Sequence, residues 1–410
     1  MTDLETLLHA SRRAARVLAV AGTEPRRAAI RAIADAIDAS VDAIVAANAE
    51  DLERGRGTLA EGLLDRLALD ADRVAALAAA ARELAGLPDP VGEVTRSRTL
   101  ANGLELTEVR VPFGVVGAIY EARPNVTVDL ACIALGSGNA IVLRGGSAAE
   151  RTNAVLVATM QRAIASVGLP AEAVQTIDAL GRAGAADLMR ARGLVDLLVP
   201  RGSQSLIDAV VRDSLVPVIE TGAGVVHAFV DAAADLEVAI PLLLNAKTQR
   251  TSVCNALETV LVHRAIADRA LPIVVDAMRA AGVTVHADGD VADAEPLGPG
   301  GWSTEHGSMD VAVRVVDDLD AAIDHIERYG THHTDVILTE DPAAADRFLA
   351  EVDSAVVMVN ASTRFTDGGQ FGFGAEVGIS TQKAHARGPM GLPELTSTKW
   401  LVRGTGQVRA

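Results

Sequence analysis

From residue 114 onward, the chain alternates between short apolar segments and segments with helical periodicity. Residues 114–120 and 140–143 are apolar along their length, and a helical pattern over residues 124–137 separates them. Strands that are apolar on both faces are typical of a mostly parallel sheet with helices packed on each side. The pattern therefore predicts an α/β fold.

A second series of the same kind follows residue 254, so we expect two doubly covered, mostly parallel sheets in two domains with a cleft between them. Further strands are expected at residues 195–198, 216–219 and 227–230 and, in the second series, at 257–262, 311–315, 335–338 and 356–359. Further helices are expected at residues 148–167, 265–281, 319–329 and 342–352.

The N-terminal part of the chain shows no strand pattern before a hairpin begins. Residues 3–86 are predicted to be helical, because apolar residues recur on one helical face. Residues 92–112 alternate in the β manner around Asn102-Gly103, which is a strong hairpin signal. Since two strands alone are marginally stable, we expect this hairpin to be an oligomerisation arm. Residues 399–402 form an expected strand that could pair with it.

The composition restricts the compartment and the partners. The 410 residues carry a net charge of −17, and the pI near 5.0 argues against a nucleic-acid partner. The acidic N-terminus does not resemble a signal peptide, and no apolar stretch approaches membrane-spanning length. The two cysteines have no spacing suited to a disulfide framework. We therefore predict a cytoplasmic protein without membrane or nucleic-acid partners.

The stretch from residue 245 to residue 258 holds a lone cysteine among polar and cationic side chains. Lys247 and Arg250 precede Cys254, and cations can hold a thiol as thiolate, which is the nucleophile. A small buried cysteine is the alternative, because free cysteines are often buried. The polar neighbours favour the nucleophile for Cys254, whereas Cys132, on an apolar helix face, is expected in the core.

Metal binding is not predicted. His332 and His333 are adjacent and would point to opposite faces of a strand, and no third ligand has a helpful spacing. We expect this motif, at residues 328–335, to be a substrate-side loop or a solvated turn.

Two glycine turns lie between a predicted strand and a predicted helix, where free N–H groups and the helix dipole favour an anion. The residues of these turns are Arg144, Gly145, Gly146 and Ser147 in the first, and Arg201, Gly202 and Ser203 in the second. Arg144 could meet a 2′-phosphate and so select NADP(H), or could simply face solvent. Arg201 could bind a cofactor or substrate phosphate, or cap its turn. A Gly-x-Gly-x-x-Gly fingerprint is absent from such a context.

Two further polar groups follow predicted strands. Glu220, two residues before Gly222, could act as a general base or position a nicotinamide; a surface carboxylate is the alternative. Arg123 suits an anionic group, and the amide of Asn125 suits a developing oxyanion, with helix capping as its alternative.

The glycine-rich stretch at residues 372–383 is also a candidate. Its Ser380 and Thr381 could wrap a carboxylate or a phosphate, or the stretch could be a crossover between domains.

Taken together, these motifs resemble the γ-glutamyl phosphate reductase family of the aldehyde dehydrogenase superfamily. The segment Asn245-Ala-Lys-Thr-Gln-Arg-Thr-Ser-Val-Cys254-Asn-Ala-Leu-Glu-Thr resembles the active-site segment of that family. The other matching stretches are residues 122–129, 141–146, 199–202, 329–335 and 374–389. The match runs in the family's order from about residue 10 to the C-terminus. Thr251 stands where the family usually has proline, and Val225-Val226 replaces more polar residues.

The resemblance implies an NADP(H)-binding domain at residues 1–91 and 114–226, a catalytic domain at 227–380, and an oligomerisation element at 92–113 and 381–410. It implies NADPH-dependent reduction of L-glutamyl 5-phosphate to glutamate 5-semialdehyde and phosphate, the second step of proline synthesis. A hydrolytic NAD(P)-dependent aldehyde dehydrogenase is the alternative. A homodimer or homotetramer, and association with the pathway's glutamate kinase, are further expectations.

The resemblance also implies roles for the candidate residues. Cys254 would form a thioester, and Asn125 with the Cys254 backbone N–H would hold the oxyanion. Glu220 matches the glutamate that activates water in hydrolytic relatives, and here we expect it to orient the nicotinamide or manage a proton. The candidates for the phosphate or the substrate carboxylate are Arg123, Arg201, Lys247 and Arg250.

Overall fold

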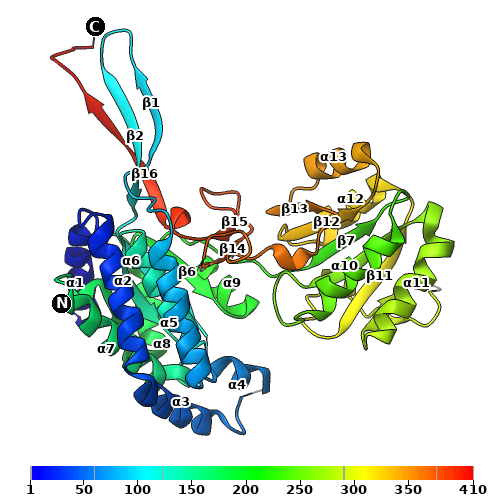
Figure 1. Ribbon diagram of the computed structural model, residues 1–410, viewed down its shortest axis with the longest axis horizontal. Helices are drawn as coiled ribbons and strands as arrows, with labels where there is room; N and C mark the ends of the chain where they lie inside the picture. The colour runs from blue at the N-terminus through cyan, green and yellow to red at the C-terminus, as the bar shows by residue number, and fades with distance from the viewer. Residues whose placement is uncertain (1, 60, 122, 290, 375, 410) are drawn as a thin grey trace. The chain divides into compact units, whose positions relative to one another are not determined.

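The computed structural model describes residues 2–59, 61–121, 123–289, 291–374 and 376–409. The chain divides into two compact units, which we call unit 1 and unit 2 (Figure 1). Unit 1 takes the chain up to Thr221, together with Gly372–Gly378 and the part from Met390 onward. Unit 2 comprises Gly222–Phe371 and Ile379–Pro389.

Unit 1 is built on a parallel sheet of four strands in the order β5-β4-β3-β6. The strands are β3 (Val115–Tyr120), β4 (Ala140–Arg144), β5 (Val174–Thr176) and β6 (Leu197–Arg201). All six residues of β3 are buried, as expected for a central strand that is apolar on both faces. The predicted α/β fold is confirmed for this unit.

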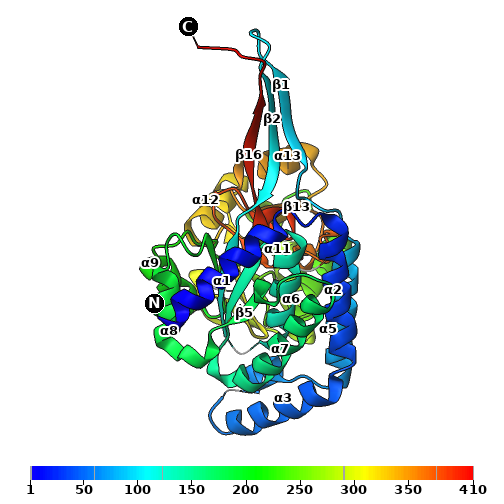
Figure 2. The same cartoon turned by 90° about the vertical axis from the view of Figure 1, so that its left-hand side faces the viewer.

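Helices cover this sheet, and the N-terminal helices add a second layer. Helices α6 (Pro124–Gly136) and α7 (Glu150–Ser166) pack on the strands, and α2 (Thr23–Asp38) and α5 (Ala71–Gly86) pack on α6 and α7 in turn (Figure 2). Ile30, Ile33 and Ile37 of α2 are all buried, so the apolar face predicted for this segment is the face that packs. The remaining helices are α1 (Asp3–Leu18), α3 (Val41–Gly55), α4 (Glu61–Leu67), α8 (Gly181–Arg190) and α9 (Gln204–Asp213).

The predicted hairpin and its predicted third strand form an arm on unit 1 (Figure 2). Strands β1 (Val94–Thr99) and β2 (Glu105–Pro112) pair antiparallel, and β16 (Thr396–Arg403) pairs antiparallel with β2 over eight residue pairs. Both predictions of strand pairing are confirmed. All residues of β1 and all but the first of β16 are exposed, so the chain itself does not cover the outer strands of this sheet.

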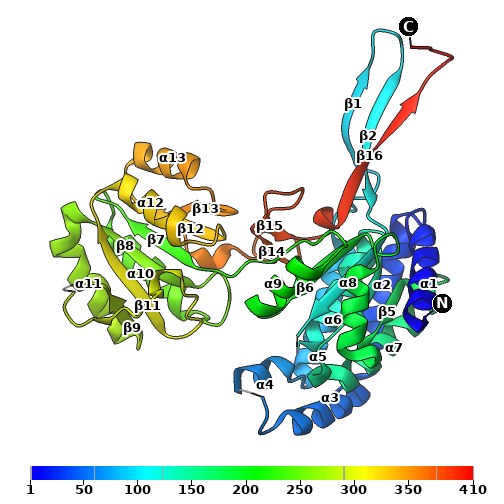
Figure 3. The ribbon, with the colours of Figure 1, turned by 180° about the vertical axis from the view of Figure 1, so that it is seen from behind.

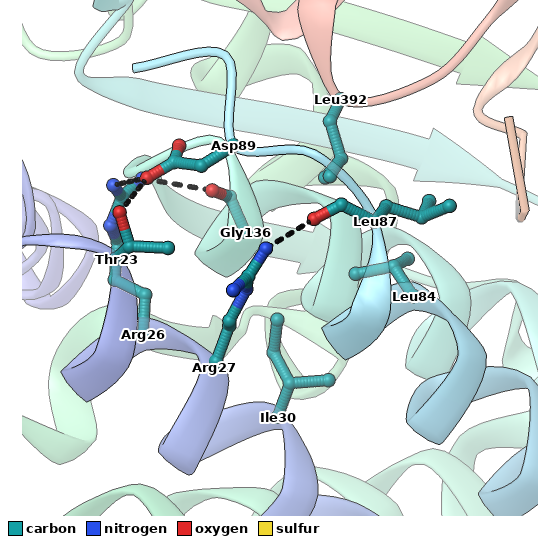
Figure 4. Close-up of a pocket in the computed structure, with 9 residues that line it drawn as sticks. All are labelled: Thr23, Arg26, Arg27, Ile30, Leu84, Leu87, Asp89, Gly136 and Leu392. Carbon is teal, nitrogen blue, oxygen red and sulfur yellow. Dashed lines mark hydrogen bonds and ion pairs between the residues drawn. The ribbon is translucent and has the colours of Figure 1, made fainter. Parts of the chain in front are cut away.

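A polar cluster fastens the root of this arm to the helices (Figure 4). The buried guanidinium of Arg26 donates to the Asp89 carboxylate at 2.6 Å and to the carbonyl of Gly136 at 2.8 Å. Thr23 donates to the same carboxylate at 2.6 Å, and Leu392, close before β16, lines the same small pocket. The linker that leads into the arm is thereby tied to α2 and α6.

Unit 2 is built on a parallel sheet of seven strands in the order β10-β9-β11-β8-β7-β12-β13 (Figure 3). The strands are β7 (Val226–Val230), β8 (Leu257–His263), β9 (Thr284–Ala287), β10 (Glu295–Pro296), β11 (Asp310–Val316), β12 (Thr334–Leu338) and β13 (Val356–Val359). Each described strand pairing in this sheet is parallel.

Successive residues of β8 serve two separate cores, which is the signature of a sheet covered on both faces. Val260 and Val262 join the core under α10 (Leu236–Thr248) and α11 (Ala267–Ala280). Leu261 joins the core under α12 (Leu319–Tyr329) and α13 (Pro342–Glu351). The predicted second doubly covered sheet is confirmed.

A two-stranded ribbon of β14 (Gly378–Ser380) and β15 (Gly388–Met390) carries the chain out of and back into unit 1. The stretch that contains Ser380 and Thr381 is therefore a crossover between the two units, which was one of the two roles predicted for it. Among the residues that the structure describes, no helix is both long enough and apolar enough to cross a bilayer.

Two sequence expectations differ from the structure. Residues 216–219 do not form a regular strand: Val218 makes an isolated bridge with Leu198, and Pro217 lacks the N–H that a ladder would need. The boundary between the units falls after Thr221, whereas the predicted cofactor domain extends to residue 226. Likewise residues 372–378 belong to unit 1 and residues 381–389 to unit 2, so the predicted limits at 380 and 381 are shifted.

Candidate active site

Cys254 lies in the loop that joins the end of α10 to the start of β8. Its side chain is half-buried, whereas Cys132 is fully buried in α6, where burial raises the pKa of the thiol. The loop lies at the amino end of β8. The residues predicted to contact a cofactor lie instead at the carboxyl ends of β4 and β6, the usual ligand edge of an open α/β sheet. Cys132 is core, as predicted, and Cys254 is the accessible thiol.

A glycine segment packs directly against the backbone of Cys254. A Cβ atom placed on Gly224 would overlap the Cys254 carbonyl oxygen and would lie 2.8 Å from its Cα atom. A Cβ atom on Gly222 would lie 2.8 Å from Oγ1 of Thr381. Val225 donates to Oγ1 of Thr331 at 3.0 Å, which fixes the end of the segment. The structure thus brings Gly222, Thr381 and Cys254 together around residues 222–225.

Replacing Gly224 with alanine is expected to lower kcat at least about ten-fold, because the Cys254 backbone must move to admit the new methyl group. The measurement is steady-state turnover alongside a thermal unfolding scan. Gly298→Ala is the matched control, because a Cβ atom there would meet nothing within 4 Å. Unchanged turnover in the Gly224 variant would show that this close approach does not position the thiol.

Lys247, predicted to contact substrate, is instead fully buried. Its Nζ donates to Oε2 of Glu258 at 3.0 Å, and Glu258 also accepts from the backbone N–H groups of His306 and Gly307 at 3.3 Å. Burial raises the pKa of Glu258 to about 7 and lowers the pKa of Lys247, while each group's charge opposes the shift of the other. The substrate contact predicted for Lys247 is therefore wrong: this lysine ties the end of α10 to β8, on either side of the cysteine loop.

A pocket of about 250 Å³ lies beside the cysteine loop in unit 2. Its lining residues are Asn245, Gln249, Arg364, Phe365, Asp367 and Gln370. Burial lowers the pKa of Arg364, and the charges of Asp367 and Cys254 oppose this shift. Sequence reasoning did not select Arg364 or Asp367, because neither lies in a motif with an evident anion-binding geometry. Arg250, which it did select, is exposed.

The turn after β4 in unit 1 contains the predicted cofactor residues Arg144, Gly145, Gly146 and Ser147. Nε of Arg144 is buried and has no hydrogen-bond partner among the residues that the structure describes. The N–H of Gly145 donates to Oδ1 of Asp178 at 2.6 Å, and Asn153 donates to Oδ2 of the same carboxylate at 3.0 Å. The turn is therefore held by Asp178, with a buried guanidinium nitrogen left for a ligand.

The turn after β6 is already occupied by a carboxylate of the chain itself. Ser203 donates to Glu121 through its backbone N–H at 2.9 Å and its hydroxyl at 2.6 Å. A Cβ atom on Gly202 would lie 2.8 Å from the Glu121 carboxyl carbon. In this structure the Glu121 carboxylate occupies the donors of Ser203, and the cofactor contact predicted for Gly202 and Ser203 stays a prediction. The guanidinium of Arg201 packs against Gly378.

Asn125 lies in the first turn of α6, with Arg123 as the N-cap residue and no side-chain capping bond. Its amide donates to Oδ2 of Asp129 at 3.4 Å, so the capping alternative is not what the structure shows. Burial raises the pKa of Asp129 to about 6, which the hydrogen bond from Asn125 opposes. Glu220 follows the irregular segment at residues 216–219. Both Asn125 and Glu220 belong to unit 1, and their action on Cys254 in unit 2 stays a prediction.

Ser380 and His333, from the candidate motifs at residues 372–383 and 328–335, are both buried. Ser380 is fully buried, and its hydroxyl oxygen accepts from the N–H of Gln382 at 3.3 Å. His333 is buried, and burial lowers its pKa to about 4. The motif at residues 328–335 is therefore not simply a solvated turn; it places a neutral histidine inside unit 2.

Comparison with known proteins agrees with this architecture. The model of the aldehyde dehydrogenase family matches residues 1–299. A γ-glutamyl phosphate reductase of Clavibacter michiganensis is 64% identical, over 99% of this chain and 95% of that protein. The crystal structure of γ-glutamyl phosphate reductase from Thermotoga maritima, 44% identical, superposes with a TM-score of 0.97 over the whole of both chains. An acetylating aldehyde dehydrogenase from Geobacillus thermoglucosidasius shares the fold at 17% identity, with a TM-score of 0.71 over 100% of this chain and 98% of that chain. The chain therefore belongs to the aldehyde dehydrogenase family and, within it, to the γ-glutamyl phosphate reductases.

Proposed function

We propose that the protein catalyses the NADPH-dependent reduction of L-glutamyl 5-phosphate to L-glutamate 5-semialdehyde and phosphate, the second step of proline synthesis. The observation that carries the proposal is the accessible thiol of Cys254, held by backbone contact with Gly224 in a chain 64% identical to a γ-glutamyl phosphate reductase. An accessible thiol beside arginine is suited to nucleophilic attack on an acyl phosphate.

The chemistry on Cys254 has two stages. Its thiolate attacks the acyl carbon, and the bond from that carbon to the phosphate oxygen breaks. Inorganic phosphate departs, and the acyl group stays on the sulfur as a thioester. When bound, the reduced nicotinamide supplies the hydride that reduces this thioester. The carbon–sulfur bond then breaks, and the aldehyde leaves with regeneration of the thiolate.

The tetrahedral species at both stages carries a negative oxygen. The backbone N–H of Cys254 and the Asn125 amide are the proposed donors, and one such donor is typically worth about 3 kcal/mol. Arg123, Arg201 and Arg250 are the proposed partners of the substrate phosphate. Glu220 is proposed to orient the nicotinamide or to manage a proton.

The turn after β4 fits one end of a dinucleotide. A buried guanidinium nitrogen of Arg144 without a partner among the described residues is suited to a phosphate, and Gly146 and Ser147 offer a close backbone approach at the start of a helical segment. Arg144 is proposed to hold the 2′-phosphate, which distinguishes NADPH from NADH. The turn after β6 would accept the pyrophosphate only if Glu121 released Ser203.

Replacing Arg144 with glutamine is expected to raise KM for NADPH about ten-fold or more and to leave KM for NADH nearly unchanged, because a charge-assisted contact is lost with one cofactor only. Steady-state kinetics with both cofactors measure this ratio. Arg182→Gln, on the exposed side of α8, is the control. An equal loss with both cofactors would contradict a contact with the 2′-phosphate.

The reverse reaction tests the proposed function as a whole. NADP+ reduction by glutamate 5-semialdehyde is followed with and without inorganic phosphate, and turnover is expected only with phosphate. Turnover independent of phosphate would instead identify a hydrolytic aldehyde dehydrogenase, which releases an acid.

We propose that the arm joins copies of the chain into a homodimer or homotetramer, because both outer strands of its sheet are uncovered. Leu401→Arg on β16 is expected to reduce the mass in light scattering toward 42.4 kDa, the mass of one chain. Val20→Arg is the control, because Val20 is 84% exposed and lies outside the arm. A wild-type protein that is already monomeric would overturn the proposal. A cytoplasmic location and association with glutamate kinase stay predictions.

A further inference from the structure

The pocket beside the cysteine loop contains one cation and one anion. Arg364 and Asp367 are two of its lining residues, and the amide side chains of Asn245, Gln249 and Gln370 line it as well. The remaining lining residue, Phe365, is 51% exposed and offers an apolar surface. The pocket therefore combines opposite charges, hydrogen-bonding amides and one aromatic ring.

Hydrogen bonds tie this pocket to the residue that follows Cys254. The hydroxyl of Thr363 donates to the carbonyl of Asn255 at 2.8 Å, and the Asn255 amide donates to the carbonyl of Thr366 at 2.7 Å. Thr363 and Thr366 are fully buried, and Arg364 and Asp367 each follow one of them directly. The charged groups are thus held at a fixed place relative to the nucleophile.

The other flank of the pocket is tied to α10 and the residues that follow it. Ser362 donates to Oδ1 of Asn245 at 2.6 Å, and Nε of Arg364 donates to Oε1 of Gln249 at 2.8 Å. A guanidinium has five N–H donors, of which this bond uses one. Gln249 therefore orients the fork of Arg364 without exhausting it.

Asp367 is oriented by the loop that follows it. Its Oδ1 accepts from the backbone N–H groups of Gly369 at 2.9 Å and Gln370 at 3.1 Å. A carboxylate has about four lone-pair sites, so Oδ2 can accept further hydrogen bonds. A carboxylate in the pocket disfavours a phosphate there, because the two charges repel. The pocket suits a ligand that is itself zwitterionic.

On the basis of the proposed function, we propose that this pocket binds the α-amino-acid end of the substrate. Arg364 receives the α-carboxylate, Asp367 receives the α-ammonium group, and Phe365 lies along the methylene groups. In a glutamyl substrate, three carbon–carbon bonds separate the α-carbon from the carbon that Cys254 attacks. Because the pocket lies beside the cysteine loop, it is proposed to hold the amino-acid end of the substrate. The phosphate is left to the arginines outside the pocket.

The experiment compares two aldehydes in the phosphate-dependent reverse reaction. Glutamate 5-semialdehyde carries the α-ammonium group, and 5-oxopentanoate lacks only that group. Asp367→Asn is expected to lower kcat/KM for glutamate 5-semialdehyde about ten-fold or more, mainly through KM, and to change the value for 5-oxopentanoate little. Asparagine keeps an oxygen for the N–H groups of Gly369 and Gln370, so the loop is expected to persist.

Arg364→Gln supplies the complementary result. Both aldehydes carry the carboxylate, so kcat/KM is expected to fall for both by a similar factor of about ten or more. Asp324→Asn, exposed on α12 in the same unit, is the control. An Asp367 variant that keeps the wild-type preference between the two aldehydes overturns the inference.

A binding measurement separates this inference from the proposed function. The affinity of L-glutamate and of glutarate is measured by calorimetry on the wild-type protein and on Asp367→Asn. Selective binding of L-glutamate that requires Asp367 supports the pocket even if phosphate-dependent turnover is absent, in which case the proposed reaction fails alone. Equal affinity for the two ligands, or a preference that survives Asp367→Asn, overturns the pocket assignment.

Discussion

Alanine in place of Cys254 is expected to abolish turnover, by about 10⁴-fold or more, with little change in stability. The substitution removes the sulfur that is proposed to form the thioester, and the hydroxyls of Thr251 and Ser252 on the same loop are far weaker nucleophiles than a thiolate. Because the side chain is only half-buried, its loss leaves no large cavity in a core. The measurement is phosphate-dependent turnover, combined with mass spectrometry of the protein mixed with acyl phosphate in the absence of cofactor.

Cys132→Ala is the matched control, because Cys132 is the chain's second thiol and is buried in α6. This variant is expected to keep kcat and the acyl adduct and to unfold at a somewhat lower temperature, since a buried sulfur is lost. The wild-type adduct is expected on the peptide that contains Cys254. Turnover that survives in Cys254→Ala, or an adduct on another residue, would remove the thioester from the mechanism.

The sequence was informative where local pattern and burial agree. Alternation around Asn102-Gly103 predicted the hairpin, and residues 399–402 were expected to form a strand that could pair with it. Continuous apolar runs predicted β3 and β4, because strands covered on both faces need apolar residues at nearly every position.

Elements without a single apolar stripe were missed. Helix α10 is apolar around much of its circumference and contains Pro241, so periodicity does not mark it. In the opposite case, residues 216–219 look like a buried strand, but Pro217 limits them to one bridge. Tertiary hydrogen bonding, rather than local pattern, decides such segments.

The candidate site was predicted in part. Thr381 packs on Gly222 and Cys254 packs on Gly224, so two predicted segments of unit 2 lie along the same glycine segment. The pocket residues Arg364 and Asp367 escaped notice, since hydrogen bonds between Asn255 and residues more than 100 positions away place them. Lys247 was assigned to substrate because nothing in a lysine's sequence context reveals a buried partner.

Replacing Lys247 with methionine is expected to destabilise unit 2 by about 3–5 kcal/mol at pH 8, because Glu258 is left buried without its partner and must either stay charged or take up a proton. Unfolding in urea can be followed through Trp302, which is buried in unit 2. The variant is made in a Trp400→Phe background, which removes the chain's other tryptophan from the signal.

The loss is expected to be smaller at pH 6. Burial already raises the pKa of Glu258 from 4.5 to about 7 with Lys247 present, and without the lysine the pKa rises further. Between the ordinary pKa of 4.5 and the raised pKa of the folded state, the folded state binds more protons than the unfolded state. The free energy of unfolding therefore falls as pH rises through this window. Acid therefore relieves the variant, because a protonated Glu258 carries no buried charge.

The double variant Lys247→Met/Glu258→Gln separates two contributions to the free energy of unfolding. One is the cost of an unpaired buried charge, and the other is the stabilisation that the ion pair itself provides. Glutamine removes the charge and keeps an oxygen for the N–H groups of His306 and Gly307. This variant is expected to regain most of the stability and to lose the pH dependence, because neutral replacements of buried ion pairs are often tolerated. If it remained as unstable as the single variant at both pH values, the ion pair itself would hold the cysteine loop between α10 and β8.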